Sequence, residues 1–180
     1  MLVYRSILLS FLMLCLPAVN AAILENGDFS TCNFAGWERD TDGAGVIASG
    51  NDFSINGTAP SCEAVISVDY TDTEAFFANT LFQFLDFSSA GSGPLTLSMD
   101  IEVDSELTES DNNFVADYFA VSFFDGINFY DNTGAIGTLF EANINGFASY
   151  TLSFLLDASL TSLSNLSLDF QLLLGADDDG

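Results

Sequence analysis

Apolar and polar residues alternate along several short stretches of this chain, most clearly from Leu95 to Asp104. Leucine, methionine, isoleucine and valine occupy every second position there, with threonine, serine, aspartate and glutamate between them. Successive side chains of a β-strand point to opposite faces, so this spacing predicts a half-buried strand with an acidic outer face. Similar patterns predict strands at Ala64–Val68, Thr80–Phe87, Phe114–Phe124, Ile127–Tyr130, Tyr150–Leu156 and Leu166–Leu174.

Turn-forming dipeptides separate these stretches, among them Asp42-Gly43, Asn56-Gly57, Asp125-Gly126 and Asn145-Gly146. Asp125-Gly126 is the best hairpin candidate, because Asp-Gly suits the positive φ angles of a tight type I′ turn. Short strands joined by tight turns predict an all-β fold, an antiparallel jelly-roll-like β-sandwich. The chain has no internal repeat and no linker, so we expect a single domain over residues 22–180.

The first 21 residues have the pattern of a secretory signal peptide. Arg5 supplies a short positive region, residues 7–16 (ILLSFLMLCL) form the apolar segment, and Val19-Asn20-Ala21 offers small residues for cleavage. A membrane anchor is the alternative, but about ten apolar residues are too few to span a bilayer. We therefore expect a secreted, extracellular protein.

Removal of this leader would also remove Cys15, which leaves Cys32 and Cys62. Two cysteines in an exported protein are most simply a disulfide, and two buried free thiols are the alternative. Metal ligation by these thiols is disfavoured, because the chain has no histidine to complete a site.

Acidic residues dominate the charge: the chain has 26 Asp and Glu, 2 Arg and Lys, no His, and a net charge of −24. Phosphate contacts need Lys and Arg, so nucleic acid is excluded as a partner, and an anionic membrane surface would repel the chain. Without His or Lys, the common nucleophile–base schemes are absent in their usual forms. Paired carboxylates for glycoside hydrolysis remain in principle, but no two are singled out, so we expect no enzyme.

The opening after the leader, Asn26-Gly27-Asp28-Phe29 and then Phe34-Ala35-Gly36-Trp37, resembles a family of bacterial exported proteins. These are PEP-CTERM-type surface proteins with a galactose-binding-like jelly-roll domain related to carbohydrate-binding modules. Leu81-Phe82-Gln83, residues 93–101 (GPLTLSMDI), residues 117–126 (DYFAVSFFDG) and residues 150–154 (YTLSF) follow in the family's order. The resemblance implies an envelope or extracellular-matrix protein.

The end of the chain departs from that family. Its members close with a further strand, a Pro-Glu-Pro motif, an apolar helix and a basic tail, whereas this sequence stops at Gly180 after an aspartate run. We therefore expect the last strand of the sandwich to be missing. Surface anchoring is expected only if a longer parent chain carries the sorting tail.

Calcium is the metal that the acidic composition suits best, because it prefers hard oxygen ligands. The resemblance implies a structural calcium held by a Glu of the opening motif, but Ser30 stands at that position. The candidate ligands are Asp28, Asp40, Asp42, Asp177 and Asp179, and the alternative is a solvated acidic surface. The acidic positions of residues 100–106 have the same two interpretations, a binding ridge or the wet side of a strand.

Carbohydrate binding usually uses exposed Trp or Tyr side chains with polar groups beside them. Trp37 is the only Trp and is expected in the core, together with most of the 18 Phe. Tyr130, beside Asn128 and Asn132, is therefore the sugar-binding candidate, and a sideways-packed tyrosine is the alternative.

The sequence thus predicts a non-catalytic structural or adhesion protein of the envelope or exopolysaccharide matrix. The alternative is a carbohydrate-binding module, with or without calcium. Polysaccharide or envelope components are the expected partners.

Overall fold

The computed structural model describes residues 24–41, 47, 52–67, 78–90, 93–105, 118–142, 144 and 146–173. Its strands are β1 Glu38–Asp40, β2 Phe53–Thr58, β3 Ser61–Ile66, β4 Ala78–Phe84, β5 Leu95–Ser105, β6 Tyr118–Phe124, β7 Phe129–Tyr130, β8 Phe140–Ala142, β9 Gly146–Leu156 and β10 Ser167–Leu173. Two short 3-10 helices, η1 Phe87–Ser89 and η2 Leu160–Ser162, complete the elements. The described residues contain no α-helix, which confirms the predicted all-β class.

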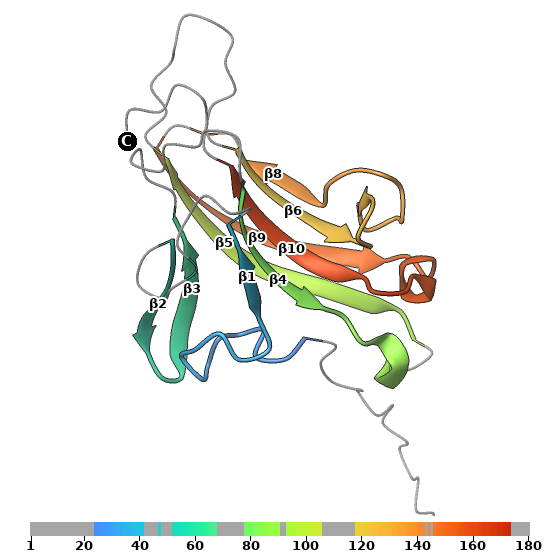
Figure 1. Ribbon diagram of the computed structural model, residues 1–180, viewed down its shortest axis with the longest axis horizontal. Coiled ribbons are helices and arrows are strands. Elements are labelled where there is room, and N and C mark those ends of the chain that lie inside the picture. Colours follow the sequence, from blue (N-terminus) through green and yellow to red (C-terminus); the bar gives the residue numbers. More distant parts are fainter. Residues whose placement is uncertain are drawn as a thin grey trace, which may run out of the picture.

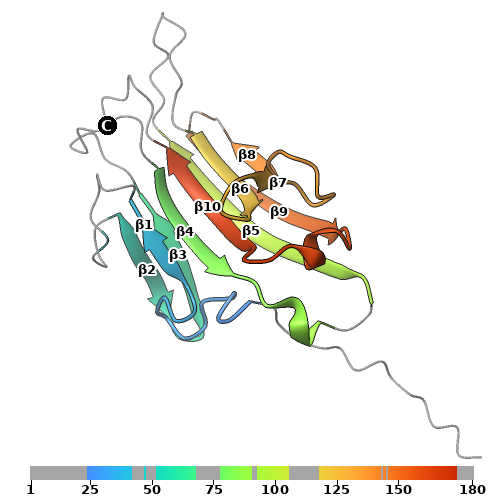
Figure 2. The same ribbon diagram turned by 45° about the vertical axis from the view of Figure 1, so that its right-hand side comes forward.

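The strands form antiparallel sheets arranged in two layers. One sheet has six strands in the order β1-β4-β10-β6-β7, with β8 also paired to β6. The second layer contains the β2–β3 hairpin and the β5–β9 pair. Figures 1 and 2 show the six-stranded sheet in front of β5 and β9. The predicted antiparallel β-sandwich is therefore confirmed.

The core lies between these layers, and β5 and β9 illustrate why. In their register, Leu97 pairs with Phe154, Met99 with Leu152, and each of these side chains packs against the buried cluster. The residues between them are exposed on both strands. The period of two predicted from the apolar pattern of residues 95–104 is confirmed, because opposite residues of an antiparallel pair project from the same face.

The opening segment of residues 24–37 is fastened to the six-stranded sheet by Gln83. Its Oε1 atom accepts the Glu25 N–H at 2.7 Å, and its Nε2 atom donates to the carbonyls of Glu25 at 2.9 Å and Gly36 at 2.7 Å. Trp37 is buried in the core, as expected, and stacks on Phe29 with ring centroids 5.3 Å apart. The motif that carries the family resemblance thus forms a compact loop that closes one end of the core.

The predicted disulfide between Cys32 and Cys62 is present, with a Cα–Cα distance of 5.3 Å. It joins the opening segment to β3, because Cys62 lies within that strand. Gly57 lies opposite Cys62 in β2 and has a φ of +100°. A Cβ atom there would lie 2.3 Å from the Ser61 carbonyl oxygen, so only glycine fits beside the bridge.

Asn56-Gly57 was expected to be a turn, and that prediction is wrong. Both residues lie inside β2, and the hairpin turns two residues later at Ala59-Pro60. Gly57 instead allows a close approach of two backbones within the strand pair. The preference of Asn-Gly for turns does not reveal this second use of glycine. The patterns also missed strands β1, β2 and β8, of which β1 and β8 have only three residues each.

The hairpin predicted at Asp125-Gly126 exists, but its turn differs from a two-residue type I′ turn. β6 and β7 are joined by the four residues 125–128, and Phe124 pairs with Phe129. The Asp125 carboxylate accepts the N–H groups of Ile127 and Asn128, both at 2.8 Å. This capping of the loop by an aspartate side chain explains the longer connection, because Asp readily bonds the backbone two residues on.

The predicted leader of residues 1–21 lies outside the described residues, as does the end of the chain beyond Leu173. No helix in the described part of the chain is long and apolar enough to cross a membrane.

Candidate binding face

The strand register divides the side chains of the six-stranded sheet between two faces. Leu81, Phe170 and Val121 lie opposite one another on β4, β10 and β6, and all three belong to the core. The neighbouring row, Phe82, Asp169 and Ser122, therefore projects from the other face. We call this second face, which points away from the core, the outer face.

Ser122 and Asp169 are buried polar residues in the middle of the outer face. Ser122 is 1% exposed and Asp169 is 5% exposed, although neither contributes to the apolar core. The Ser122 hydroxyl has no hydrogen-bond partner within the described part of the structure. A buried polar group without a partner costs about 1–3 kcal/mol, so this position is unfavourable for the free protein.

The Asp169 carboxylate and a backbone carbonyl compete for the hydroxyl proton of Ser167. The Ser167 Oγ atom lies within hydrogen-bond distance of both Asp169 Oδ1 and the Phe124 carbonyl oxygen. A hydroxyl has one proton and can donate it to only one of them. Burial raises the pKa of Asp169 to about 6, against the lowering effect of the Ser167 hydrogen bond. The Asp169 carboxyl group therefore keeps its proton to a higher pH than an ordinary aspartate does.

Aromatic side chains border the polar residues of the outer face. Phe84 and Phe124 lie on either side of Ser167 in the register, and Phe129 lies beyond Phe124. Phe124 and Phe129 stack with ring centroids 4.6 Å apart, and Phe82 meets the edge of Phe84 at 5.7 Å. Phe84 is 55% exposed. The outer face therefore has aromatic rings around small polar side chains, which are themselves buried.

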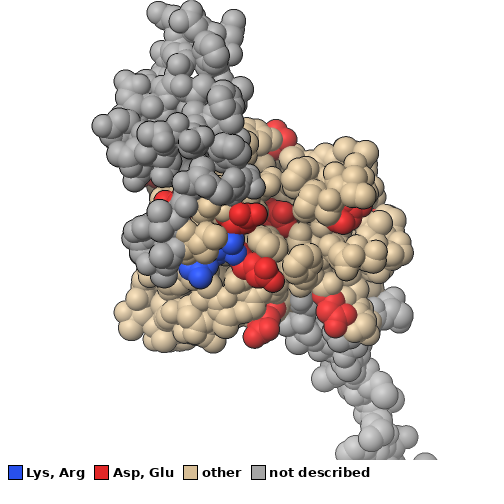
Figure 3. Space-filling view, viewed as in Figure 1, with Lys and Arg blue, Asp and Glu red and all other residues tan. Residues whose placement is uncertain are grey.

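The charge of this face is mainly negative. Glu38 and Glu141 project from it at register positions opposite Phe82 and Ala120. Figure 3 shows several acidic side chains near the middle of the visible surface, with one cationic patch beside them. Arg39 lies opposite Leu81 in the register, is partly exposed, and has its guanidinium carbon 4.7 Å from the centroid of the Phe34 ring. Repulsion by these carboxylates disfavours an anionic ligand.

The three predicted sugar-binding residues lie in or beside the β6–β7 hairpin, and each makes a hydrogen bond within the protein. The Tyr130 hydroxyl donates to Asp125 Oδ2 at 2.8 Å, and Asn128 Nδ2 lies 3.5 Å from the same hydroxyl. The acceptor carboxylate raises the pKa of Tyr130. Asn132 Nδ2 donates to the Leu155 carbonyl at 3.0 Å. These contacts stabilise the hairpin, and Tyr130 itself packs partly against the core.

Only two of the five predicted calcium ligands, Asp28 and Asp40, lie among the described residues. Asp28 accepts the Ser30 N–H at 3.1 Å, which lowers its pKa, whereas Asp40 lies on β1 opposite Thr80. Asp42, Asp177 and Asp179 lie outside the described residues. Among the residues that are described, no group of three His, Cys, Asp or Glu side chains could hold a metal ion.

The acidic ridge of β5 lies on the outside of the other layer and is matched by hydroxyl groups of β9. Asp100 Oδ1 accepts the Thr151 hydroxyl at 2.7 Å, and Glu102 Oε1 accepts the Ser149 hydroxyl at 3.4 Å. Their partners are directly opposite in the register. These contacts are typical of the solvated side of a strand, which was one of the two predicted interpretations of the ridge; the other was a binding ridge. Glu106 lies outside the described residues.

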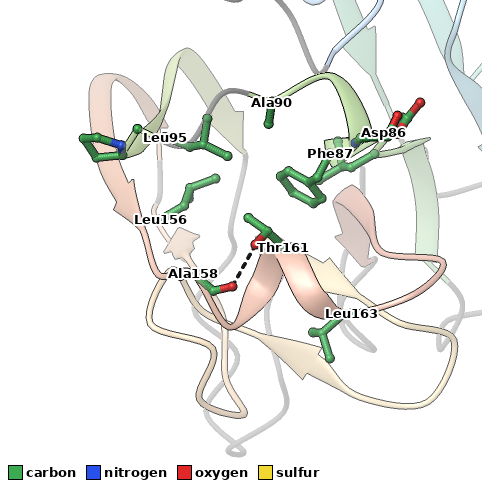
Figure 4. A pocket seen from close by; sticks show the side chains of 12 residues that line it. Asp86, Phe87, Ala90, Leu95, Leu156, Ala158, Thr161 and Leu163 are labelled. Atoms are coloured by element: carbon green, nitrogen blue, oxygen red, sulfur yellow. Dashed lines mark hydrogen bonds between the residues drawn. The ribbon is translucent and has the colours of Figure 1, made fainter.

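A cavity of about 480 Å³ lies where η1 and η2 approach the ends of β5 and β9. Figure 4 shows Leu95, Leu156, Phe87 and Thr161 around it. Its lining combines leucine side chains with polar groups, of which the Thr161 hydroxyl donates to the Ala158 carbonyl at 2.8 Å and the Asp86 carboxylate accepts the Ser88 N–H at 2.8 Å. Its polar groups are thus engaged locally rather than directed at a ligand.

Ser122 and Asp169 were not among the predicted site residues. Ser122 is a small polar residue among the apolar residues of YFAVSFF, which is a signal that could have marked it. Asp169 alternates with apolar residues in SLDFQLL, as Ser167 and Gln171 do, and this pattern does not distinguish it from an ordinary polar position of a strand. Their proximity could not be predicted, because β10 lies between β4 and β6 only through the sheet topology.

Fold and disulfide together define a disulfide-bonded all-β sandwich protein with one polar-aromatic sheet face. No protein-family model matches the chain, and no curated protein matches it. Among solved structures, it is similar to the crystal structure of the enzymatically active domain of tailspike protein 4 from bacteriophage CBA120. The two chains are 13% identical with a TM-score of 0.43, and the match covers 84% of this chain and 20% of the tailspike chain. This chain therefore spans about a fifth of the length of the tailspike chain.

Proposed function

We propose that this chain is a non-catalytic, exported structural or adhesion protein of an envelope or exopolysaccharide matrix. It holds polysaccharide on the outer face of the six-stranded sheet. The observation that carries this proposal is the aromatic border of that face, with Phe84 exposed and Phe124 stacked on Phe129. Flat apolar rings beside hydrogen-bonding groups suit sugar rings, whose faces are apolar and whose edges are polar.

Export is supported by the disulfide, and the acidic composition restricts the possible partners. The Cys32–Cys62 bridge suits an oxidising compartment. The net charge of −24 favours solubility and disfavours binding to nucleic acid and to anionic membrane surfaces. The resemblance to PEP-CTERM-type exported proteins agrees with this location.

A non-catalytic role is supported by the surroundings of Asp169. Glycoside hydrolysis requires two carboxyl groups facing the scissile bond. The register partners of Asp169 are Phe82 and Ser122, neither of which is acidic. The chain has no His and no Lys that could act as a general base or nucleophile.

The alternative is a carbohydrate-binding module assisted by calcium. A glycan array read with and without calcium distinguishes the two, since calcium-dependent binding to one sugar class favours the module. Calcium should also raise Tm more than sodium chloride of equal ionic strength if an ion binds. Such a rise would point to ligands beyond the described residues, because those contain no suitable cluster.

Two phenylalanines on different faces provide a matched test of the proposed role. Phe84 is 55% exposed on the outer face, and Phe147 is 63% exposed on β9 in the other layer. We expect Phe84→Ala to weaken binding to matrix polysaccharide by about tenfold or more, since covering an exposed phenylalanine side chain contributes roughly 1.5–3 kcal/mol. Phe147→Ala should leave binding unchanged. Equal binding by both variants and the unaltered protein would place the ligand elsewhere.

A further inference from the structure

The Ser122 hydroxyl is an unused hydrogen-bonding group in the middle of the outer face. It is 1% exposed and has no partner in the described part of the structure. Natural proteins satisfy most buried polar groups, and the exceptions call for an explanation. A ligand group that reaches Ser122 would remove an existing penalty as well as form a new bond.

Asp169 supplies complementary chemistry directly across the strand pair. The register places it opposite Ser122, and the Ser167 hydroxyl is its hydrogen-bond partner among the described residues. A carboxylate has about four lone-pair sites and accepts from more than one donor. The pair therefore offers a strong acceptor beside a hydroxyl that can donate or accept.

A neutral hydroxyl group fits this pair best. It can donate its proton to Asp169 and accept one from Ser122, whereas a carboxylate or sulfate would be repelled by Asp169 and by Glu38 on the same face. Phe82 and Phe84 lie beside the pair and can cover the apolar face of a sugar ring.

We infer that Ser122 and Asp169 form a saccharide subsite that binds a hydroxyl group of a neutral sugar and discriminates against uronate and sulfated polysaccharides. This inference rests on the proposed function, because it names the ligand class and polar contacts of the same face. Phe82, which lies opposite Asp169 in the register, and Phe84 supply the apolar contacts of the subsite, and Ser167 orients Asp169.

The test measures binding of the full chain to soluble dextran, galactan and mannan, with alginate as the anionic and chitosan as the cationic comparison. Ser122→Ala and Asp169→Asn should each lower affinity for the bound neutral polymer about three- to tenfold, the range of one hydrogen bond. Ser122→Ala should also keep or raise Tm, since it removes an unpaired buried hydroxyl. The control is Ser153→Ala on β9, whose hydroxyl lies 3.3 Å from that of Ser98 on the other layer.

The outcomes separate the subsite from the proposed function. Unchanged affinity in both Ser122→Ala and Asp169→Asn, with binding still lost in Phe84→Ala, overturns the subsite and leaves the adhesion role standing. Stronger binding to alginate than to every neutral polymer overturns the ligand class. Absence of binding to any of the five polymers overturns both.

Discussion

Ser122 and Asp169 face each other across β6 and β10, and both project from the face of the sheet that points away from the core. The hydroxyl of one has no partner in the described structure, and burial raises the pKa of the other. A polar pair of this kind weakens the free protein and is explained if a ligand completes its hydrogen bonds.

Asp169→Asn should change how the free energy of unfolding depends on pH. The folded-state pKa of Asp169 is raised from 3.8 to about 6. Its contribution is therefore fully present below pH 3.8 and is lost as pH rises through about 6, because the unfolded chain releases the proton first. Relative to the variant, the unaltered protein should lose about 3 kcal/mol over this window in urea unfolding.

Asp157→Asn provides a control of opposite sign. Hydrogen bonds from Ser159 lower the pKa of Asp157. Stability from that group is present above the ordinary pKa of an aspartate and disappears as pH falls through the lowered value. Parallel stability curves for Asp169→Asn and the unaltered protein would refute the buried-acid assignment.

Reduction of the disulfide should destabilise the protein substantially. Cys32 and Cys62 are 30 residues apart, and a bridge over a loop of that length contributes roughly 3–4 kcal/mol on the chain-entropy model. Urea unfolding of the Cys32→Ser/Cys62→Ser double variant measures the loss, with the oxidised chain as reference. A change below about 1 kcal/mol would mean that the unfolded chain is already constrained.

Glu141→Gln should lower the pKa of Tyr118. Burial, together with the hydrogen bond and negative charge of Glu141, raises that pKa to about 12. Removal of the charge leaves burial as the main cause, so ultraviolet titration of tyrosinate should show one group ionising at lower pH. Tyr118→Phe identifies the group, because the shifted step must be absent from that variant. An unmoved titration would exclude the contact between them.

Gln83→Leu should detach the opening segment from the sheet. Gln83 is buried and makes three hydrogen bonds to the backbone of Glu25 and Gly36. Their loss leaves backbone groups unpaired, at a cost of roughly 3 kcal/mol in unfolding free energy. Gln171→Leu, on the outer face, is the matched control and should cost much less. Equal losses in the two variants would argue against the clamp.

The strands could be predicted from the sequence where one face is buried and the other is exposed to solvent. Leu95–Asp104 shows the period of two because β5 has a buried side and an exposed side. The prediction from turn-forming dipeptides failed at Asn56-Gly57, where glycine serves a close approach to Ser61 rather than a turn. Strands of three residues, such as β1, are too short to show any period.

The site was less predictable than the fold. Composition directed attention to exposed aromatic and acidic groups and selected Tyr130, whose hydroxyl donates to Asp125. Ser122 and Asp169 become neighbours only when β10 inserts between β4 and β6, a pairing of strands distant in the sequence. Burial and the absence of a partner are properties of the assembled sheet, and no local pattern encodes them.

The most direct test of polysaccharide binding by the outer face is an NMR titration of the full chain with oligosaccharides from the neutral polymer that it binds. We predict that the largest shifts occur at the rings of Phe82, Phe84, Phe124 and Phe129, with the Phe147 ring unaffected. Shifts confined to Phe147 and the residues of β5 and β9, or no shifts at saturating oligosaccharide, would contradict the account.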